Sequence, residues 1–433
     1  MYRKNRETLF EKLPANSVAL ISSSEEKIRN RDVEYPFRVD SDFHYLTGFT
    51  EPDALLVLIN LETKKSVLFL REKDPLKETW EGRRLGVEKA PNALNVDESY
   101  SIESLDEKIL PLIKGCEKIY FSFSELNSWA QNVSQWVKAL KQEVRQGINA
   151  PTQLSDLDEI LHELRLFKSP DEIVKLKQAC QISVAGHLKA MQTALNASYE
   201  YQVQADLEAE FKRQSSPRVA FNSIVASGEN ACILHYTENE SQIDKNALLL
   251  IDAGAEFEGY AGDITTTFPA SGRFSAEQAK LYSLVLEAQR AVIEMIKPGI
   301  AYNAMHKKSI EVLTNGLVDL GLLDGEVNKL IEQEAFKRFF MHGTGHWLGR
   351  DVHDVGRYKI DSQWRTLEEG MVLTVEPGLY ISSEHSDIDK KWHNIGIRIE
   401  DDVLVTANGC EVLTKGLPRT VAEIEGFMLS KGS

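Results

Sequence analysis

The 433-residue sequence has few cysteines and no long apolar run. No stretch approaches the roughly 20 apolar residues that a membrane span requires, so we expect no membrane partner. Residues 1–21 include Glu7 and Glu11 and no uninterrupted apolar stretch, which is unlike a secretory or organelle-targeting segment. The cysteines are widely spaced and form no CxxC pair: Cys116, Cys180, Cys232 and Cys410. Scattered reduced thiols favour a cytoplasmic protein.

The sequence also lacks an excess of positive charge. It has 50 Lys and Arg against 66 Asp and Glu, a formal net charge of −16. Binding to a phosphate backbone needs clustered Lys and Arg, so we expect no nucleic-acid partner. The chain is too long for one ordinary hydrophobic core, which predicts two domains.

The N-terminal part of the chain alternates short β-rich runs with helical ones. Strands are predicted at 17–22, 54–61, 65–70 and 118–123, and helices at 101–113 and 124–144. This alternation predicts a smaller α/β domain over residues 1–165. Residues 147–156, broken by Gly147 and Pro151, are predicted to be a linker.

A helix start at Ser169 opens the second domain, predicted over residues 166–433. Ser169 fits an N-cap, Pro170 the first helical position and Glu172 the acid of a capping box. Beyond it, helical segments mix with strands without strict alternation. This pattern predicts an α+β fold with a largely antiparallel sheet.

Five polar residues of the second domain lie in or beside apolar, strand-like runs. They are Asp252, Asp263, His346, Glu376 and Glu400. A lone carboxylate in such a run is costly, and four acids and one imidazole brought together need a strong positive charge. Two divalent metal ions would supply that charge.

Asp252 and Asp263 flank a predicted hairpin. If the turn centres on Phe257 and Glu258, the two aspartates lie directly opposite each other on one face, and their charges repel unless something binds between them. Two solvated hairpin acids are the alternative. The apolar strand that precedes Asp252 weakens that alternative.

Glu400 and Glu376 are weaker signals. The isoleucines of 395–400 fall on one face of a strand, and Gly396, Arg398 and Glu400 fall on the other. Such a strand can line a site, with Arg398 steadying a carboxylate, or can be half-exposed. Glu376 ends an apolar run before Pro377, where a glutamate is often simply solvated.

The segment HGTGHWLGRDVHD at 342–354 places three histidines among glycines. We interpret His346 as a metal ligand, and His342 and His353 as groups beside the metal or the substrate that bind or move protons. Hydrogen-bonded core histidines are the alternative. His235 lies in a polar loop and carries no signal of its own. A carboxylate-rich set with one imidazole suits Mn²⁺, Co²⁺, Fe²⁺ or Zn²⁺.

These motifs resemble the pita-bread metallopeptidases. The contexts IDAG, GDIT, HGTGH, EPG and RIED occur in the family's ligand order. Within the family the chain is most similar to the aminopeptidase P branch, through further segments at 35–58, 81–86, 164–173, 227–239 and 342–354. The resemblance implies a C-terminal pita-bread catalytic domain and a smaller N-terminal α/β domain.

The resemblance also implies residue roles. Asp252 would bind one ion, Asp263 and Glu400 would bridge both, and His346 and Glu376 would complete the other. His235 and His353 would contact substrate around the scissile bond, His342 would shape the proline side of the pocket, and Tyr380 and Arg398 would lie beside the site.

Trp80 and Arg350 stand apart from the metal ligands. Trp80 resembles a tryptophan that reaches a neighbouring subunit's active site in tetrameric relatives, so a homodimer or homotetramer is expected. Arg350 is a departure, because relatives usually have an apolar residue there; it could change packing or charge near the site.

The resemblance implies a metal-dependent exopeptidase. It would bind two divalent ions, most naturally Mn²⁺, and would use a metal-bridging hydroxide. Its substrates would be peptides with proline in second place, from which it releases the N-terminal residue. Prolidase, which acts on dipeptides only, is the nearest rival. A binding module that has lost its metals is a second rival, and a creatinase-like activity is a third.

Overall fold

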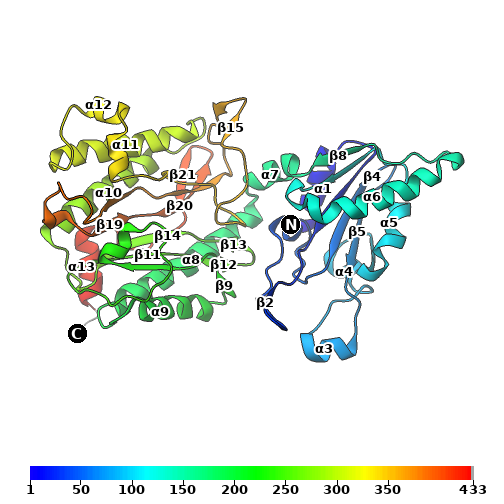
Figure 1. The fold of residues 1–433 in the computed structure, drawn as a ribbon, viewed down its shortest axis with the longest axis horizontal. Helices are drawn as coiled ribbons and strands as arrows, with labels where there is room; N and C mark the ends of the chain where they lie inside the picture. The colour runs from blue at the N-terminus through cyan, green and yellow to red at the C-terminus, as the bar shows by residue number, and fades with distance from the viewer. Residues whose placement is uncertain (431–433) are drawn as a thin grey trace. The chain divides into compact units, whose positions relative to one another are not determined.

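The computed structural model describes residues 1–430, and these divide into two compact units, Met1–Arg165 and a second unit that begins at Leu166 (Figure 1). Within the described part of the chain, no helix is both long and apolar enough to cross a bilayer. The four cysteines are free thiols.

The N-terminal unit is built on a six-stranded sheet of order β6-β5-β4-β1-β7-β8. Its strands are β1 (Ser17–Ser22), β4 (Leu55–Asn60), β5 (Lys64–Leu70), β6 (Glu98–Ser101), β7 (Lys118–Phe121) and β8 (Gln153–Asp156). Its helices are α1 (Tyr2–Lys12), α2 (Ser41–Thr47), α3 (Pro75–Glu81), α4 (Ala90–Leu94), α5 (Leu105–Ile113), α6 (Leu126–Gln142) and α7 (Asp158–Leu166). β2 (Ile28–Asn30) and β3 (Val33–Glu34) form a separate two-stranded ribbon.

Alternate residues of the sheet serve two different cores. Val18 and Leu20 of β1 belong to the core beneath α5 and α6, whereas Ala19 and Ile21 belong to the core beneath α1 and α2. Both faces are covered, so the central strands are almost wholly apolar. The predicted linker 147–156 is wrong in part, because β8 lies within it and pairs in parallel with β7.

The C-terminal unit contains small antiparallel sheets between long helices. Its strands are β9 (Arg218–Val219), β10 (Ile224–Ser227), β11 (Leu248–Ala253), β12 (Ala255–Phe257), β13 (Tyr260–Ala261), β14 (Ile264–Pro269), β15 (Lys359–Ile360), β16 (Gln363–Trp364), β17 (Val372–Val375), β18 (Gly378–Ile381), β19 (Ile395–Arg398), β20 (Asp401–Thr406) and β21 (Gly409–Val412). Its α-helices are α8 (Pro170–Thr193), α9 (Glu200–Arg213), α10 (Ala276–Met295), α11 (Tyr302–Asp319), α12 (Val327–Glu332) and α13 (Val421–Ser430).

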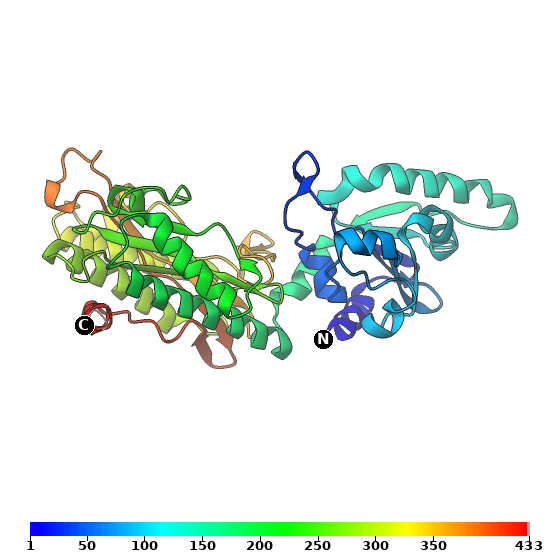
Figure 2. The same cartoon turned by 90° about the horizontal axis from the view of Figure 1, so that it is seen from below.

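The helices of this unit cover the strands from two sides. α8 and α9 lie along one side of β11 and β14, and α10 and α11 lie along the other (Figures 1 and 2). All the pairings between these strands are antiparallel. The predicted α+β class is therefore confirmed.

The start of α8 follows its sequence signal. The Ser169 side chain and the Glu172 carboxylate form the capping box, and Pro170 occupies the first helical turn. Glu172 accepts from the backbone N–H of Ser169 at 2.9 Å. These local bonds satisfy donors that a helix N-terminus otherwise leaves open.

Candidate functional site

The turn of the hairpin that carries the two aspartates lies one residue later in the chain than predicted. Its turn lies at Glu258 and Gly259, which both have positive φ (49° and 75°), as in the tight turns that suit hairpins. Asp252 therefore pairs with Thr265, and the predicted direct opposition to Asp263 is wrong. Asp263 lies two residues along from that partner. Because side chains repeat every two residues, both aspartates still project to one face.

The Asp263 backbone leaves the ladder at this point. Its N–H donates to the carboxylate of Asp402 at 3.0 Å, on β20. The second oxygen of that carboxylate is buried without a hydrogen-bond partner. Burial raises the pKa of Asp402 to about 7, and Cys180 donates its S–H to the same carboxylate at 3.2 Å. Asp402 thus fixes the main chain from which Asp263 projects.

Asp263, His346 and Glu400 converge in the C-terminal unit. One ligand atom from each lies within 4.8 Å of the others. His346 Nδ1 donates to the Trp347 carbonyl at 2.9 Å, which leaves Nε2 as the acceptor nitrogen. That Nε2 lies 3.4 Å from an Asp263 oxygen. Two carboxylates and a neutral imidazole are a donor set that fits a divalent cation.

Glu376 borders the same cluster. Its carboxylate lies 3.7 Å from His346 Nε2 and also 3.7 Å from Nδ1 of His342. Thr374, two residues earlier on β17, donates to it at 3.3 Å and accepts from the His346 backbone N–H at 3.1 Å. Glu376 is therefore held facing the cluster, unlike a glutamate that is simply solvated at a strand end.

The electrostatics of the cluster call for a cation. Burial and the neighbouring acids raise the pKa of Asp263 and of Glu400 well above the usual range, and burial raises the pKa of Glu376. One Asp252 oxygen is buried and has no hydrogen-bond partner. Gathered carboxylates and an unpartnered buried oxygen are the features that bound divalent cations satisfy, so the residues present fit the implied metal pair.

Arg398 connects Asp252 to the Tyr380 hydroxyl and, through that hydroxyl, to His342. Its Nη2 donates to Asp252 at 2.7 Å and its Nη1 to the Tyr380 hydroxyl at 2.9 Å. That hydroxyl lies 2.8 Å from Nε2 of His342, whose Nδ1 donates to the Gly343 carbonyl at 2.7 Å. Burial, then the charge of Arg398, lowers the pKa of His342 to about 3. His342 is therefore a neutral acceptor that fixes the Tyr380 hydroxyl.

His353 and His235 are the exposed histidines of the predicted set. The His353 ring lies 4.3 Å from the His346 ring, centroid to centroid. Burial, with His346 and His235 close by, lowers the pKa of His353. His353 can therefore face a ligand at neutral pH as an uncharged imidazole.

The last two predicted positions are Trp80 and Arg350. Trp80 belongs to α3 of the N-terminal unit and is 88% exposed. Arg350 is buried, and its guanidinium carbon lies 4.4 Å from the Tyr260 ring centroid. A cation–π contact of this kind helps to accommodate a buried guanidinium.

Three supporting residues were missed from the sequence. Thr265 donates to Glu400 at 2.7 Å, Thr374 donates to Glu376, and Asp402 accepts from the backbone of Asp263. The run of threonines at 265–267 inside a buried strand was a usable signal, because buried hydroxyls need partners.

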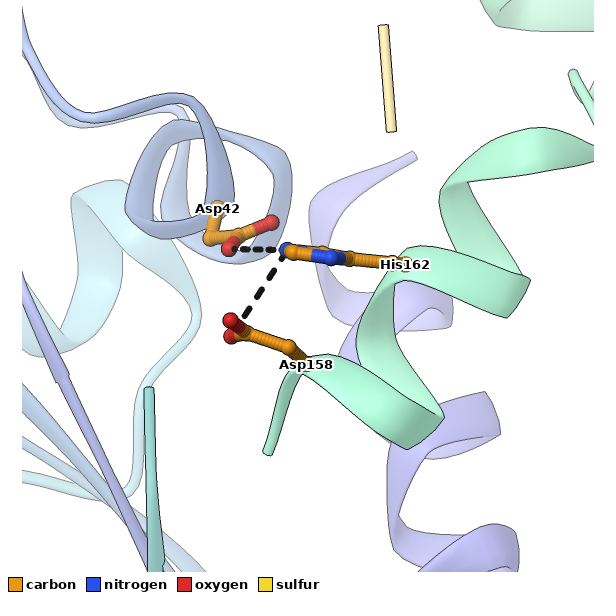
Figure 3. Close-up of side chains that lie close together, drawn as sticks. All are labelled: Asp42, Asp158 and His162. Atoms are coloured by element: carbon orange, nitrogen blue, oxygen red, sulfur yellow. Dashed lines mark hydrogen bonds and ion pairs between the residues drawn. The ribbon is translucent and has the colours of Figure 1, made fainter. Parts of the chain in front are cut away.

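A second acid–histidine cluster lies in the N-terminal unit. His162 Nε2 lies 3.2 Å from Asp42 and 3.6 Å from Asp158 (Figure 3). Arg165 also donates to Asp42, at 2.7 Å. Burial alone would raise the pKa of Asp42, but Arg165 and His162 outweigh it and lower that pKa to about 2. Since Arg165 already occupies this carboxylate, the cluster is an ion-pair network that joins α2 to α7.

Comparison with known families matches both units. A model of metallopeptidase family M24 matches residues 174–407, more than half of the chain. A model of the aminopeptidase P N-terminal domain matches residues 2–120.

Relatives match along almost the whole length. The chain is 47% identical to a Xaa-Pro aminopeptidase of Haemophilus influenzae, over 99% of this chain and 96% of the relative. Its fold matches an aminopeptidase PepP structure from Pseudomonas aeruginosa with a TM-score of 0.97 and 46% identity, covering 99% and 97% of the two chains. A zinc-substituted Escherichia coli aminopeptidase P in complex with product matches with a TM-score of 0.96 and 42% identity, covering 99% and 98%.

Proposed function

Since the chain belongs to metallopeptidase family M24 and to its aminopeptidase P group, the Xaa-Pro aminopeptidases, we propose that the acid cluster of the C-terminal unit is its active centre. The convergence of Asp263, His346 and Glu400 carries the proposal. Asp252 and Glu376 would complete the ligand set, and Asp263 and Glu400 would each serve both ions. Two divalent ions held by these residues would activate a water molecule as the nucleophile and would stabilise the negative charge that develops on the attacked carbonyl oxygen.

Mn²⁺ is the ion that we propose for this site. Four of the five donors are carboxylates, and oxygen-rich sets suit hard divalent ions. The zinc-substituted Escherichia coli enzyme shows that a relative's site also accepts zinc. Comparison of Mn²⁺, Co²⁺ and Zn²⁺ in reconstituted protein decides between them.

The substrate is a peptide whose second residue is proline, and the histidines handle its scissile bond. His235 and His353 are exposed and donate N–H groups to the oxygen of the attacked carbonyl. His342 is held by Tyr380 and lines the proline side. Arg398 is paired with Asp252, so that this carboxylate keeps one orientation.

Proton transfer to the leaving nitrogen falls to a group near Glu376 or to a histidine. An amide to proline has no N–H, and its nitrogen must gain a proton before it leaves. Glu376 lies 3.7 Å from His346 Nε2 and 3.7 Å from His342 Nδ1, so this part of the site brings carboxylate and imidazole groups together.

A peptide panel tests the proposal. Xaa-Pro-Yaa, Xaa-Pro and Xaa-Ala-Yaa peptides are offered to chelated protein and to protein with Mn²⁺ restored. We expect release of the N-terminal residue from Xaa-Pro-Yaa only, and only with metal. Cleavage of Xaa-Pro dipeptides alone would identify a prolidase. An absence of both bound metal and activity would identify a binding module.

Asp263→Asn removes the charge of a shared ligand at nearly constant size. We expect kcat/KM to fall roughly a thousandfold, because the site loses both metal affinity and the nucleophile. Asp319→Asn is the matched control, since Asp319 lies at the exposed end of α11. Full activity in Asp263→Asn would overturn the assignment.

A homodimer or homotetramer and a cytoplasmic setting complete the proposal. The exposed Trp80, with Leu76 80% exposed on the same helix, supports a subunit contact at α3. Four free cysteines suit a reducing compartment. Light scattering of the wild type and of Trp80→Ala tests the assembly, and we expect the variant to form smaller particles.

A further inference from the structure

Glu400 lies at a break between two strands. β19 ends at Arg398 and pairs with β18, whereas β20 begins at Asp401 and pairs with β17. The Glu400 backbone N–H therefore donates to a third strand, to the Thr265 carbonyl at 3.1 Å. Because backbone groups at a strand break lack regular ladder partners, other residues must hold the main chain of this ligand in place.

The guanidinium of Arg419 meets that need. Its Nη2 donates to the Glu400 carbonyl at 2.8 Å, and its Nη1 donates to the Thr265 carbonyl at 3.2 Å. The Thr265 hydroxyl in turn donates to the Glu400 carboxylate at 2.7 Å. One side chain therefore fixes the backbone of the ligand and the backbone of the residue that orients the ligand.

Arg419 is itself held firmly. Nη2 also contacts the Asp401 carboxylate, which accepts from Gln289 of α10 at 2.9 Å. The Arg419 backbone N–H donates at 3.1 Å to Glu423, in the first turn of α13. The side chain is only 14% exposed. The fork therefore occupies one defined position, set by the start of the C-terminal helix.

We propose that Arg419 is a positioning residue for the metal centre, acting through the backbone of Glu400 and Thr265. This inference rests on the proposed function, because it assumes that Glu400 binds metal. A planar guanidinium is required, since two carbonyls and a carboxylate are engaged by one group with fixed donor directions. The segment before α13 thereby becomes part of the support of the active centre, although it supplies no ligand.

The test compares Arg419→Gln and Arg419→Lys with wild type in the full chain. The probe is Co²⁺, whose visible absorption reports coordination geometry, and affinity is taken from the titration. We expect Arg419→Gln to bind Co²⁺ roughly 10- to 100-fold more weakly, as for other changes behind a metal ligand, with an altered spectrum. Arg419→Lys keeps the pairing with Asp401 but not the fork, so it should recover only part of the affinity. With Mn²⁺ saturating, kcat should fall while KM stays constant.

Arg273→Gln is the matched control. Arg273 lies 3.9 Å from Glu425 of α13 and is 72% exposed, so the change disturbs the same helix without touching Glu400. We expect its Co²⁺ spectrum and affinity to be those of wild type.

The outcomes separate the two proposals. If wild type binds no Co²⁺, the proposed metal centre is wrong. If wild type binds and a folded Arg419→Gln binds equally well with the same spectrum, only the role of Arg419 is wrong. If Arg419→Gln does not fold, Arg419→Lys decides, and wild-type affinity in that variant would overturn the inference.

Discussion

At the scale of single residues, one hydroxyl connects a carboxylate of the acid cluster with the arginine beside it. Thr265 donates to Glu400 at 2.7 Å and accepts from Nε of Arg398 at 3.1 Å. Valine has the same shape and makes neither bond. We expect Thr265→Val to weaken Mn²⁺ binding roughly 10- to 100-fold, because Glu400 loses a partner that orients it. Equilibrium metal titration measures the effect.

Thr267→Val is the control for that prediction. Thr267 lies on the same strand and is as fully buried as Thr265, but its hydroxyl contacts only backbone groups of Arg398. We expect each valine variant to lose roughly 1–2 kcal/mol of unfolding free energy, and only Thr265→Val to lose metal affinity. An equal loss of affinity in both would assign the effect to packing.

His187 makes the contact of α8 with the hairpin sensitive to pH. It is fully buried, and it donates to the Ala253 carbonyl at 3.0 Å and accepts from Thr266 at 2.8 Å. Burial lowers its pKa from 6.5 to about 4. The unfolded chain therefore takes up the proton first as the pH falls. The stability that neutral His187 contributes is complete above pH 6.5 and declines between pH 6.5 and 4.

His187→Gln tests that pH dependence, because glutamine keeps an N–H donor and gains no proton. Hydrogen exchange of the α8 amides, corrected for intrinsic rates, measures the opening free energy at pH 8 and near pH 4. We expect wild type to lose up to about 3 kcal/mol more than the variant over this range. Parallel losses in the two proteins would contradict the assignment.

The sequence indicates the proposed ligands by residue type, but it does not indicate the side chains that hold the backbone of those ligands in place. Asp263, His346 and Glu400 stand out in the sequence because charged groups interrupt apolar runs. Asp402 and Arg419 act on backbone groups of other segments, the Asp263 N–H and the Glu400 carbonyl. Their own surroundings in the sequence carry no trace of those partners, so only the folded chain reveals them.

At the scale of elements, a close backbone approach shapes the hairpin behind Asp252 and Asp263. A Cβ added at Gly254 would lie 1.6 Å from the Gly262 carbonyl oxygen. We expect Gly254→Ala to lower the unfolding free energy by roughly 3 kcal/mol, because backbone atoms cannot move aside as a flexible side chain can. Thermal unfolding measures the loss. Gly426→Ala in α13, where nothing lies within 4 Å, should instead stabilise slightly.

The same hairpin shows why register is hard to predict. The apolar run before Asp252 and the β-rich run that begins at Asp263 predict the two strands, but a turn placed at 257–258 or at 258–259 changes the partner of Asp252 by two residues. The positive φ of Glu258 places the turn one residue later than expected, and Gly259 alone could not decide this from sequence. The prediction that both aspartates lie on one face does not depend on this difference, because a register shift of two residues leaves each side chain on the same face of the sheet.

At the scale of the whole molecule, the chain is two units with separate apolar cores. Residues that pack around β1 and β4 form the cores of the N-terminal unit, and α8, α10 and β11 contribute to the largest core of the other. The sequence predicted both classes because strand and helix periodicities are local. Assembly is not local, and nothing in the periodicity of α3 specifies a partner for Trp80.

Separate cores predict two unfolding transitions with different sensitivities. All five proposed ligands belong to the C-terminal unit, so metal binds and stabilises only that unit in its folded state. Saturation at a thousand times the dissociation constant adds about 4 kcal/mol by mass action. We expect chelation to lower the midpoint of that transition by roughly 10 °C in calorimetry and to leave the other unchanged.

Asp42→Asn is expected to destabilise the N-terminal unit alone, as chelation destabilises the C-terminal unit alone. It removes the charge that faces Arg165, whose side chain is 2% exposed, and it also weakens the pairing with His162. Loss of one partner from a buried pair costs roughly 3 kcal/mol or more, so the transition of the N-terminal unit should fall while that of the metal-binding unit stays. Each treatment thus identifies its own transition. A single transition that shifts equally under chelation and Asp42→Asn would show instead that the two units unfold as one.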